Sequence, residues 1–299
     1  MSSVWVAFTL IAALLVSSAS ILEKKTLFHQ HAMEFLTALS LCTMMITLPL
    51  FFFADKSSLN LTAIGLIYVA SLIGSLAALY TAKALRHIAI SLTSPFLAFV
   101  PLITLAMAAV FLGERVGWLQ GTGVLVLVGG AYLLESHAHD NLLEPFKHLF
   151  KLKHMRYMFL AIILYGICSV LDKKILGVQA DGGLGISTLT YLPLAQFFQA
   201  INFIVMMLLF HDGFKGVENG IKHSWKPVLF IGILLVGSRL AYMYALSLPG
   251  VLVSLLIPVK KLSVLFSTLI GGELFHEEHV LRRSLACLIM LIGAILILL

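Results

Sequence analysis

The chain has 299 residues, of which 60% are apolar and only 11% are charged. A soluble domain is about 45–50% apolar and about 25% charged, so a soluble protein of this composition would lack the polar surface to cover itself. The net charge of +6 comes from basic residues that lie mostly in short connectors, which favours membrane-flanking positions over a nucleic-acid-binding surface. The composition therefore predicts a polytopic membrane protein.

Ten apolar runs approach the length of about 20 residues that a membrane-spanning helix needs. They predict spans at 3–23, 32–54, 61–84, 89–112, 116–135, 156–177, 187–210, 227–247, 250–272 and 280–299. The first run lacks the basic leading segment of a signal peptide, so we expect it to be kept as a span. A polar connector follows the fifth span, and its apolar positions predict an amphipathic helix at the membrane interface.

The two halves of the chain carry similar segments. The stretch AALLVSSASILEKKTL (12–27) aligns without a gap to AIILYGICSVLDKKIL (161–176), and residues 84–134 resemble residues 245–298. An odd number of spans per half forces the two halves into opposite membrane orientations. Inverted repeats are a transporter architecture, with the binding site near the midplane between the repeats.

These features predict an all-α membrane protein with ten transmembrane helices in two inverted five-helix repeats. The first repeat covers residues 1–135, the connector 136–155 and the second repeat 156–299. Small residues recur where helices would touch, which permits close packing. These positions are Ser71, Ser75, Gly121, Gly129, Gly130, Ser263, Ser267 and Gly271.

A family resemblance rests on the end of the first half, ALRHIAISLTSPFLAFVPLITLAMAAVFLGERVGWLQGTGVLVLVGGAYLL, and on its weaker second copy. With its LGER motif before a glycine-rich span, the chain resembles the drug/metabolite transporter superfamily, specifically the EamA-type ten-span members. The resemblance implies a secondary transporter of small metabolites, a group that moves amino acids, drugs, nucleotide-sugars and sugar phosphates. The second copy departs from the motif, because GGELFHEEH has no arginine after Glu273.

Three cations lie deep inside predicted spans, far from either end. Lys260 and Lys261 have roughly ten apolar or small residues on each side, about 15 Å of helix, and a charge so deep in a membrane is functional by default. Arg239 precedes the turn at 247–250 by about as many residues as Lys260 follows it, which places both at similar depth. Pro258 can kink the helix beside the lysines. The three cations predict a site for a phosphate or carboxylate group.

Other polar residues complete the candidate substrate-binding set. Asp172 is the deep carboxylate that could instead pair internally with the cations. Tyr80, Tyr242 and Tyr244 lie near the ends of predicted spans and could donate hydrogen bonds to a substrate. Membrane-interface anchoring is the alternative interpretation of the tyrosines.

A narrower resemblance concerns PVKKLSV, which is similar to the basic pair in the ninth span of plastid phosphate translocators. That family binds phosphate with a lysine and an arginine, which implies this role for Lys260 and Lys261. The chain departs from the family in having two lysines, and its fourth span, 89–112, carries no cation where the translocators have a lysine.

We therefore expect a secondary transporter that moves a small, anionic metabolite by alternating access. An exporter of amino acids or drugs, and a phospholipid-binding or flippase-like membrane protein, are the alternatives. The histidine pairs in the connectors have no metal-ligand spacing and no phosphate-binding loop motif occurs, so we expect no metal, no cofactor and no enzymatic activity.

The expected location is a bacterial inner membrane, with multiple passes. The basic residues of the connectors gather on one side, which by the positive-inside rule places both termini outside. The family resemblance implies both termini inside, so the sequence leaves the orientation open.

Overall fold

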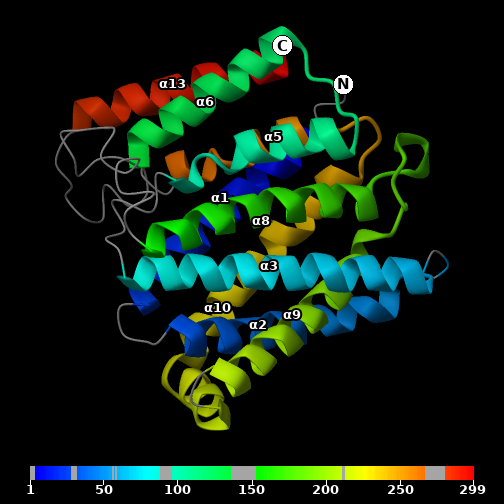
Figure 1. The fold of residues 1–299 in the computed structure, drawn as a ribbon, viewed down its shortest axis with the longest axis vertical. Helices are drawn as coiled ribbons and strands as arrows, with labels where there is room; N and C mark the ends of the chain where they lie inside the picture. Colours follow the sequence, from blue (N-terminus) through cyan, green and yellow to red (C-terminus); the bar gives the residue numbers. More distant parts are fainter. Residues whose placement is uncertain are drawn as a thin grey trace. The chain divides into compact units, whose positions relative to one another are not determined.

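The computed structural model is built from helices (Figure 1). It describes residues 4–27, 32–55, 57, 59–87, 96–135, 153–210, 213–266 and 280–299. Within these ranges no residue is in a β-strand, and five helices hold a stretch that is long and apolar enough to cross a membrane. The expected all-α membrane fold is therefore confirmed.

The helices of the first half overlap the five predicted spans, and the fourth of them covers only the later part of 89–112. They are α1 (Val4–Leu27), α2 (Ala32–Thr47) with the 3-10 helix η1 (Leu48–Phe53), α3 (Leu61–His87), α5 (Val100–Phe111) and α6 (Trp118–Glu135). Stretches of α1, of α2 with η1, and of α3 are each long and apolar enough to cross a membrane, whereas α5 and α6 are shorter apolar helices.

The second half gives a similar series with one notable difference. Its elements are α8 (Lys153–Leu176), the 3-10 helix η2 (Gln179–Asp181), α9 (Thr188–Phe210), α10 (Gly213–Ser247), α11 (Val253–Lys260) and α13 (Val280–Leu298). The predicted span 227–247 agrees with the candidate membrane span Trp225–Ser247, but the helix that contains it, α10, is longer and begins at Gly213. Residues 213–226 are polar, and an apolar-run criterion does not detect a polar helical extension.

Most of the connector 136–155 lies outside the described residues, and residues 153–155 belong to α8.

The chain forms two compact units, and each unit combines segments from both halves of the sequence. The first unit comprises Met1–Ser75 and Leu171–Gly250. Within it, α10 packs against α1, α2 and α9, and α2 packs against α9. An apolar cluster joins α1, α2 and α10, and its buried members are Ala19, Phe35, Ala38, Leu39, Val228 and Ile231.

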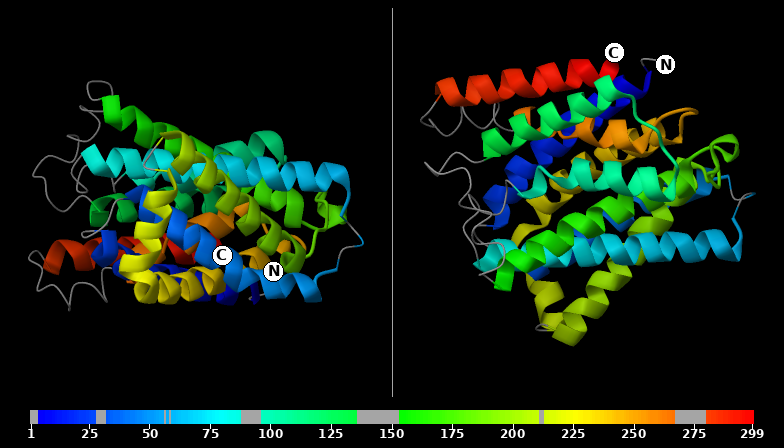
Figure 2. Two further views of the ribbon diagram at one scale, coloured as in Figure 1. Left: turned by 90° about the horizontal axis from the view of Figure 1, so that it is seen from below. Right: turned by 45° about the horizontal axis from the view of Figure 1, so that its top comes forward.

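The second unit comprises Leu76–Val170 and Val251–Leu299. Its main contact is between α6 and α13, which run side by side in Figures 1 and 2. A Cβ atom added to Gly123 would lie 2.9 Å from the Gly293 carbonyl oxygen, and one added to Gly130 would lie 2.8 Å from Met290. The two backbones therefore approach closely, as small residues permit. The same expectation was wrong for Gly121 and Gly129, where a Cβ would meet nothing within 4 Å.

Several packed pairs join helices that hold equivalent positions in the two halves. Within the first unit, α2 packs against α9, and within the second unit α5 packs against α11 and α6 against α13. These are the second, fourth and fifth predicted spans of each half. A two-fold relation between the halves would pair equivalent helices in this way, and the repeat boundaries themselves stay a prediction.

Candidate functional site

Asp172 lies in the last two turns of α8, in the first unit, and is only 9% exposed. The Tyr191 hydroxyl, from α9, donates a hydrogen bond to Oδ1 of this carboxylate. The Tyr242 hydroxyl, from α10, donates to Oδ2 at 3.4 Å. The structure thus brings together two of the predicted site residues, Asp172 and Tyr242, and adds Tyr191 from a third helix. Hydroxyl donors to both oxygens satisfy a buried carboxylate that would otherwise be costly.

The two lysines that follow Asp172 bind backbone carbonyl groups. Lys173 is buried, and its Nζ donates to the Leu246 carbonyl oxygen at 3.2 Å. Leu246 lies in the last turn of α10, where carbonyl groups lack helical partners and a positive charge is favourable. Lys174 is exposed, and its Nζ donates to the Gly182 carbonyl oxygen at 2.6 Å. The two lysines therefore bind the end of α8 to the last turn of α10 and to the loop that follows α8.

Arg239 is half-buried in α10, and its Nη1 donates to Oε1 of Gln199 in α9 at 3.0 Å. Gln199 is the twelfth of the 23 residues of α9, so this bond lies at the middle of that span. Arg239 is three residues from the centre, residue 236, of the span Trp225–Ser247. The described partner of Arg239 is therefore a neutral amide near mid-span, and this bond does not neutralise the guanidinium charge.

Further polar side chains of α9 bind the neighbouring helices of the first unit. The Thr43 hydroxyl of α2 donates to Gln196 Oε1 at 3.3 Å, and Asn202 donates to the Ser75 hydroxyl of α3 at 3.5 Å. Gln196 and Asn202 are both buried. Polar groups inside a bundle of apolar helices are expensive and gather along functional pathways. The first unit therefore has a polar interior that extends from Asp172, near the helix ends, to the middle of α9 and beyond.

The other two predicted tyrosines pack against aromatic rings. Tyr244 is 44% exposed, and its ring centroid lies 4.6 Å from that of Phe8. Tyr80, in the second unit, stacks on Tyr157 at 5.6 Å with an interplanar angle of 15°. Tyr80 and Tyr244 each contact another aromatic ring, and their role in substrate binding stays a prediction. Tyr242 belongs to the polar interior of the first unit.

Lys260 and Lys261 lie in the second unit, at a break in the helix. Helix α11 ends at Lys260, and Lys261 begins a turn. The Lys261 backbone N–H donates to the carbonyl oxygens of Ile257 and Pro258 at 3.1 and 2.9 Å. Pro258 lacks an N–H, so the helical hydrogen bond to the preceding turn is lost there. Both lysine side chains are half-buried. Arg239 and Asp172 belong to the first unit, and the convergence of the three cations stays a prediction.

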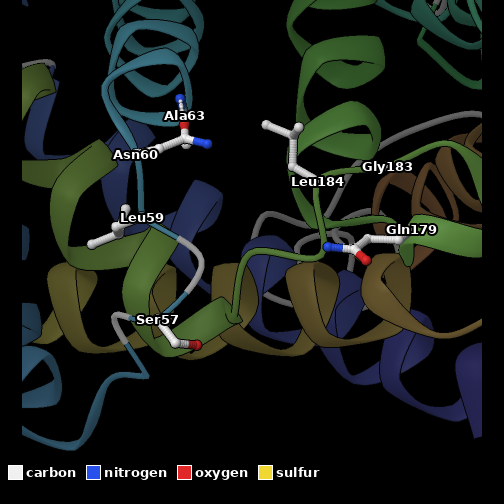
Figure 3. A pocket seen from close by; sticks show the side chains of 7 residues that line it. All are labelled: Ser57, Leu59, Asn60, Ala63, Gln179, Gly183 and Leu184. Atoms are coloured by element: carbon white, nitrogen blue, oxygen red, sulfur yellow. Dashed lines mark hydrogen bonds between the residues drawn. The ribbon is translucent and has the colours of Figure 1, made fainter.

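A pocket of about 480 Å³ lies at the loop end of the first unit. Figure 3 shows its lining, which comes from the connector before α3, from the first turn of α3 and from the connector between α8 and α9. The lining residues are Ser57, Leu59, Asn60, Ala63, Gln179, Gly183 and Leu184. Beside it, the Ser57 backbone N–H donates to Asp55 at 2.9 Å and holds the pKa of that carboxyl below its usual value. The lining carries no formal charge, so this pocket differs in chemistry from the expected anion site.

No group of three or more histidine, cysteine, aspartate or glutamate side chains that could hold a metal ion occurs in the described part of the chain. The histidines of the motifs at 29–31, 137–139 and 276–279 lie outside the described residues. So do Ser267, Gly271 and Glu273.

Comparison with known proteins identifies a family for the first half of the chain. Residues 3–136 match the model of the EamA-like transporter family, which confirms the resemblance seen in the sequence. No curated protein matches significantly. Among solved structures, one described only as "Crystal structure of protein" has a TM-score of 0.74 at 14% identity, and the match covers 99% of this chain and 96% of that chain. At this identity, the structural likeness establishes the fold alone.

Proposed function

We propose that this member of the EamA-like transporter family moves a small anionic metabolite across a membrane by alternating access. The family makes the chain a multi-pass membrane transporter of the drug/metabolite type. The class of substrate, the mechanism and a bacterial inner membrane as the location are the proposal. Arg239, Lys260 and Lys261 are proposed as the cations that bind the substrate.

The observation that carries the proposal is the placement of Arg239. A charged side chain at the centre of a span costs at least about 2.5–3.5 kcal/mol on insertion scales, and the hydrogen bond that Arg239 donates to a neutral amide oxygen offsets only part of that cost. Gln199 takes one of the five N–H donors of the guanidinium group. The planar fork of donors that remains matches a phosphate or carboxylate group. Arg239 is therefore suited to bind an anion that enters the span.

The lysine pair supports the same chemistry in the second unit. Discontinuous helices with exposed backbone groups are typical of substrate sites in secondary transporters. Helix α11 ends at Lys260, two residues after Pro258, and Lys261 begins the turn that interrupts the helix. Side chains of long cationic residues that are half-buried at such a break can reach an anion without a large change in the helix.

Alternating access is supported by the arrangement of the helices. Inverted repeats allow a carrier to exchange two mirror-related states. The packing of equivalent helices, α2 on α9, α5 on α11 and α6 on α13, is the pattern expected of such repeats.

The test is thermal unfolding of the detergent-purified protein against a ligand panel. The panel contains inorganic phosphate, glucose 6-phosphate, a nucleotide-sugar, neutral amino acids and phosphatidic acid. A ligand at 100 times its Kd stabilises the native state by about 2.7 kcal/mol. We expect stabilisation by soluble phosphorylated compounds that is lost in Arg239→Gln and in the double variant Lys260→Gln, Lys261→Gln. Stabilisation by amino acids that survives in both variants would overturn the proposal, and stabilisation by phosphatidic acid alone would assign the cations to a lipid.

A further inference from the structure

The LGER motif that carries the family resemblance forms a defined turn in the second unit. Helix α5 ends at Phe111, and Gly113 follows in the left-handed conformation with φ of 66°. A glycine adopts this conformation without the steric cost that other residues incur. The Glu114 backbone N–H donates to the Ala108 carbonyl oxygen at 3.2 Å, which closes the turn. The turn fixes the direction of the next two side chains, and Arg115 is the exposed one.

The Glu114 side chain binds the first two residues of α11, which lie about 140 residues further along the chain. Its Oε1 accepts the Val253 backbone N–H at 2.9 Å, and its Oε2 accepts the Ser254 backbone N–H at 3.0 Å. Oε2 also accepts the Ser254 hydroxyl. The first backbone N–H groups of a helix have no helical partner, and the residue at the capping position, Leu252, makes no side-chain cap. Glu114 therefore supplies a cap that the local sequence lacks.

A carboxylate suits this position for two reasons. Hydrogen bonds from backbone N–H groups to a charged acceptor are stronger than those to a neutral one, and negative charge is favourable at the positive end of the helix dipole. The same dipole favours a cation at the opposite end. Glu114 lies at the first turn of α11 and Lys260 lies in its last turn. The negative and positive charges therefore each lie at the end of the helix where the helix dipole favours them.

Helix α11 is short enough to act as one rigid segment. It has eight residues, about 12 Å of helix. Six of them are buried, namely Val253, Ser254, Leu255, Leu256, Pro258 and Val259. The helix packs against α5 and α6, the two helices that flank the LGER turn. A change at its first turn is therefore transmitted directly to the lysine pair at its end.

We propose that Glu114 is the positioning residue of the basic pair, because its carboxylate fixes the first turn of α11 and thereby places Lys260 and Lys261. This role rests on the proposed function for the anion itself. The cap can be tested without any ligand, so the two proposals fail separately.

The cap is tested by hydrogen exchange on the full-length protein in detergent. In Glu114→Ala, the amides of Val253 and Ser254 are expected to exchange about tenfold faster than in the wild-type protein, since the loss of a cap is worth about that factor. Arg115→Ala is the matched control, because it removes the neighbouring charge and leaves the cap. Equal exchange in Glu114→Ala and wild type would overturn the cap.

The positioning role is tested by the affinity for inorganic phosphate and glucose 6-phosphate. We expect about tenfold weaker binding in Glu114→Ala and an intermediate loss in Glu114→Gln, which keeps one acceptor oxygen and most of the side-chain volume. Arg115→Ala should bind as the wild type does. Gly123→Ala, which strains the contact of α6 with α13, should lower stability and leave the affinity unchanged.

The outcomes separate the two proposals. If the wild type binds neither anion, the proposed function fails and exchange at Val253 still decides whether Glu114 caps α11. If the wild type binds an anion and both Glu114 variants bind it equally well, the positioning role is overturned. If Glu114→Ala does not fold, Glu114→Gln and Ser254→Ala, which removes only the hydroxyl bond to Oε2, replace it in both measurements. If Gly123→Ala weakens binding as much as the Glu114 variants do, the loss reflects general destabilisation and the positioning role is overturned.

Discussion

Two lysine pairs end two helices of this protein, and the structure uses them differently. Lys173 and Lys174 close α8 with their ammonium groups on the carbonyl oxygens of Leu246 and Gly182. Lys260 and Lys261 lie where α11 breaks after Pro258, and both are half-buried. Lys173 and Lys174 join parts of the first unit to each other. Lys260 and Lys261 lie at the end of the short helix α11, and the Glu114 carboxylate binds the other end of that helix.

The comparison shows that neither the residue type nor the burial of a lysine is enough to assign a role. The motif DKK near the end of α8 corresponds to EKK in the first half of the chain. In α8 the two lysines of this motif bind backbone carbonyl groups. The pair at the end of α11 has no counterpart in the fourth span, since residues 89–112 carry no cation. A residue pair that breaks the internal symmetry is the better candidate for a specific ligand.

The largest effect is expected from Lys173→Met, which keeps the length of the side chain and removes its charge. The change leaves the Leu246 carbonyl without its charged donor and removes a positive charge next to the buried Asp172. Hydrogen bonds to charged groups contribute about 1.5–3 kcal/mol, so the free energy of unfolding should fall by about 3 kcal/mol. Denaturant or thermal unfolding in detergent measures it. The control is Lys174→Ala, whose exposed side chain should contribute less than about 1 kcal/mol. Equal losses of unfolding free energy in Lys173→Met and Lys174→Ala would contradict the expectation that the buried lysine contributes more than the exposed one.

The second lysine pair should show the reverse behaviour. In the double variant Lys260→Gln, Lys261→Gln, we expect the affinity for phosphorylated compounds to fall about 100-fold, which corresponds to about 2.7 kcal/mol of binding free energy. The free energy of unfolding should fall by less than it does in Lys173→Met, because Lys260 and Lys261 are half-buried whereas Lys173 is buried. Isothermal titration calorimetry and unfolding of the same preparation separate the two quantities. If the double variant loses stability and keeps its affinity, Lys260 and Lys261 have a structural role like that of Lys173, and the proposed binding role is wrong.

A smaller effect is expected at the tyrosines beside the first pair. Tyr242→Phe removes one of the two hydroxyl donors of Asp172, and the loss of a hydrogen bond to a buried carboxylate should lower the free energy of unfolding by about 1–2 kcal/mol. Tyr244→Phe, on the exposed side of the same helix, should stay within about 0.5 kcal/mol of the wild type. If both tyrosine variants unfold like the wild type, the Asp172 cluster does not stabilise the first unit.

The smallest effect separates two glycines of one helix. Gly129→Ala in α6 should leave stability unchanged or raise it by about 0.5–1 kcal/mol, since an added methyl meets nothing within 4 Å and alanine is the better helix former. At Gly130 the methyl would lie 2.8 Å from Met290, so Gly130→Ala should lower stability. Thermal unfolding of the two single variants provides the measurement. A Gly130→Ala variant as stable as Gly129→Ala would contradict the close packing of α6 on α13.

The sequence was sufficient to place the helices, because each apolar run is long and is bounded by polar or glycine-containing turns. It did not show that α10 extends to Gly213, because residues 213–226 are helical without being apolar. Single positions within a span were harder to assign. Gly130 and Gly129 are neighbours in the sequence, and only the structure shows that the first faces α13.

The candidate site was partly foreseeable. Asp172 and Arg239 stand out because a charge in an apolar run is costly, and Gln199 could have been found from the same signal. Tyr191 could not be separated from an interface anchor by its sequence position. The partners of Lys173 and Glu114 are backbone groups 73 and about 140 residues away, and no side-chain pattern identifies which helix end lies beside them. The LGER motif did contain the glutamate, and its role depended on that long-range contact.

The most direct test of the proposed anion transport is counterflow in proteoliposomes. Vesicles that contain the purified protein are loaded with unlabelled glucose 6-phosphate, or with inorganic phosphate, and are diluted into a trace of the labelled compound. We expect wild-type protein and Lys174→Ala to accumulate label transiently above its equilibrium level, and we expect no such accumulation by the Lys260→Gln, Lys261→Gln double variant. Accumulation by the double variant at the wild-type rate, or no accumulation of either anion by the wild type, would contradict it.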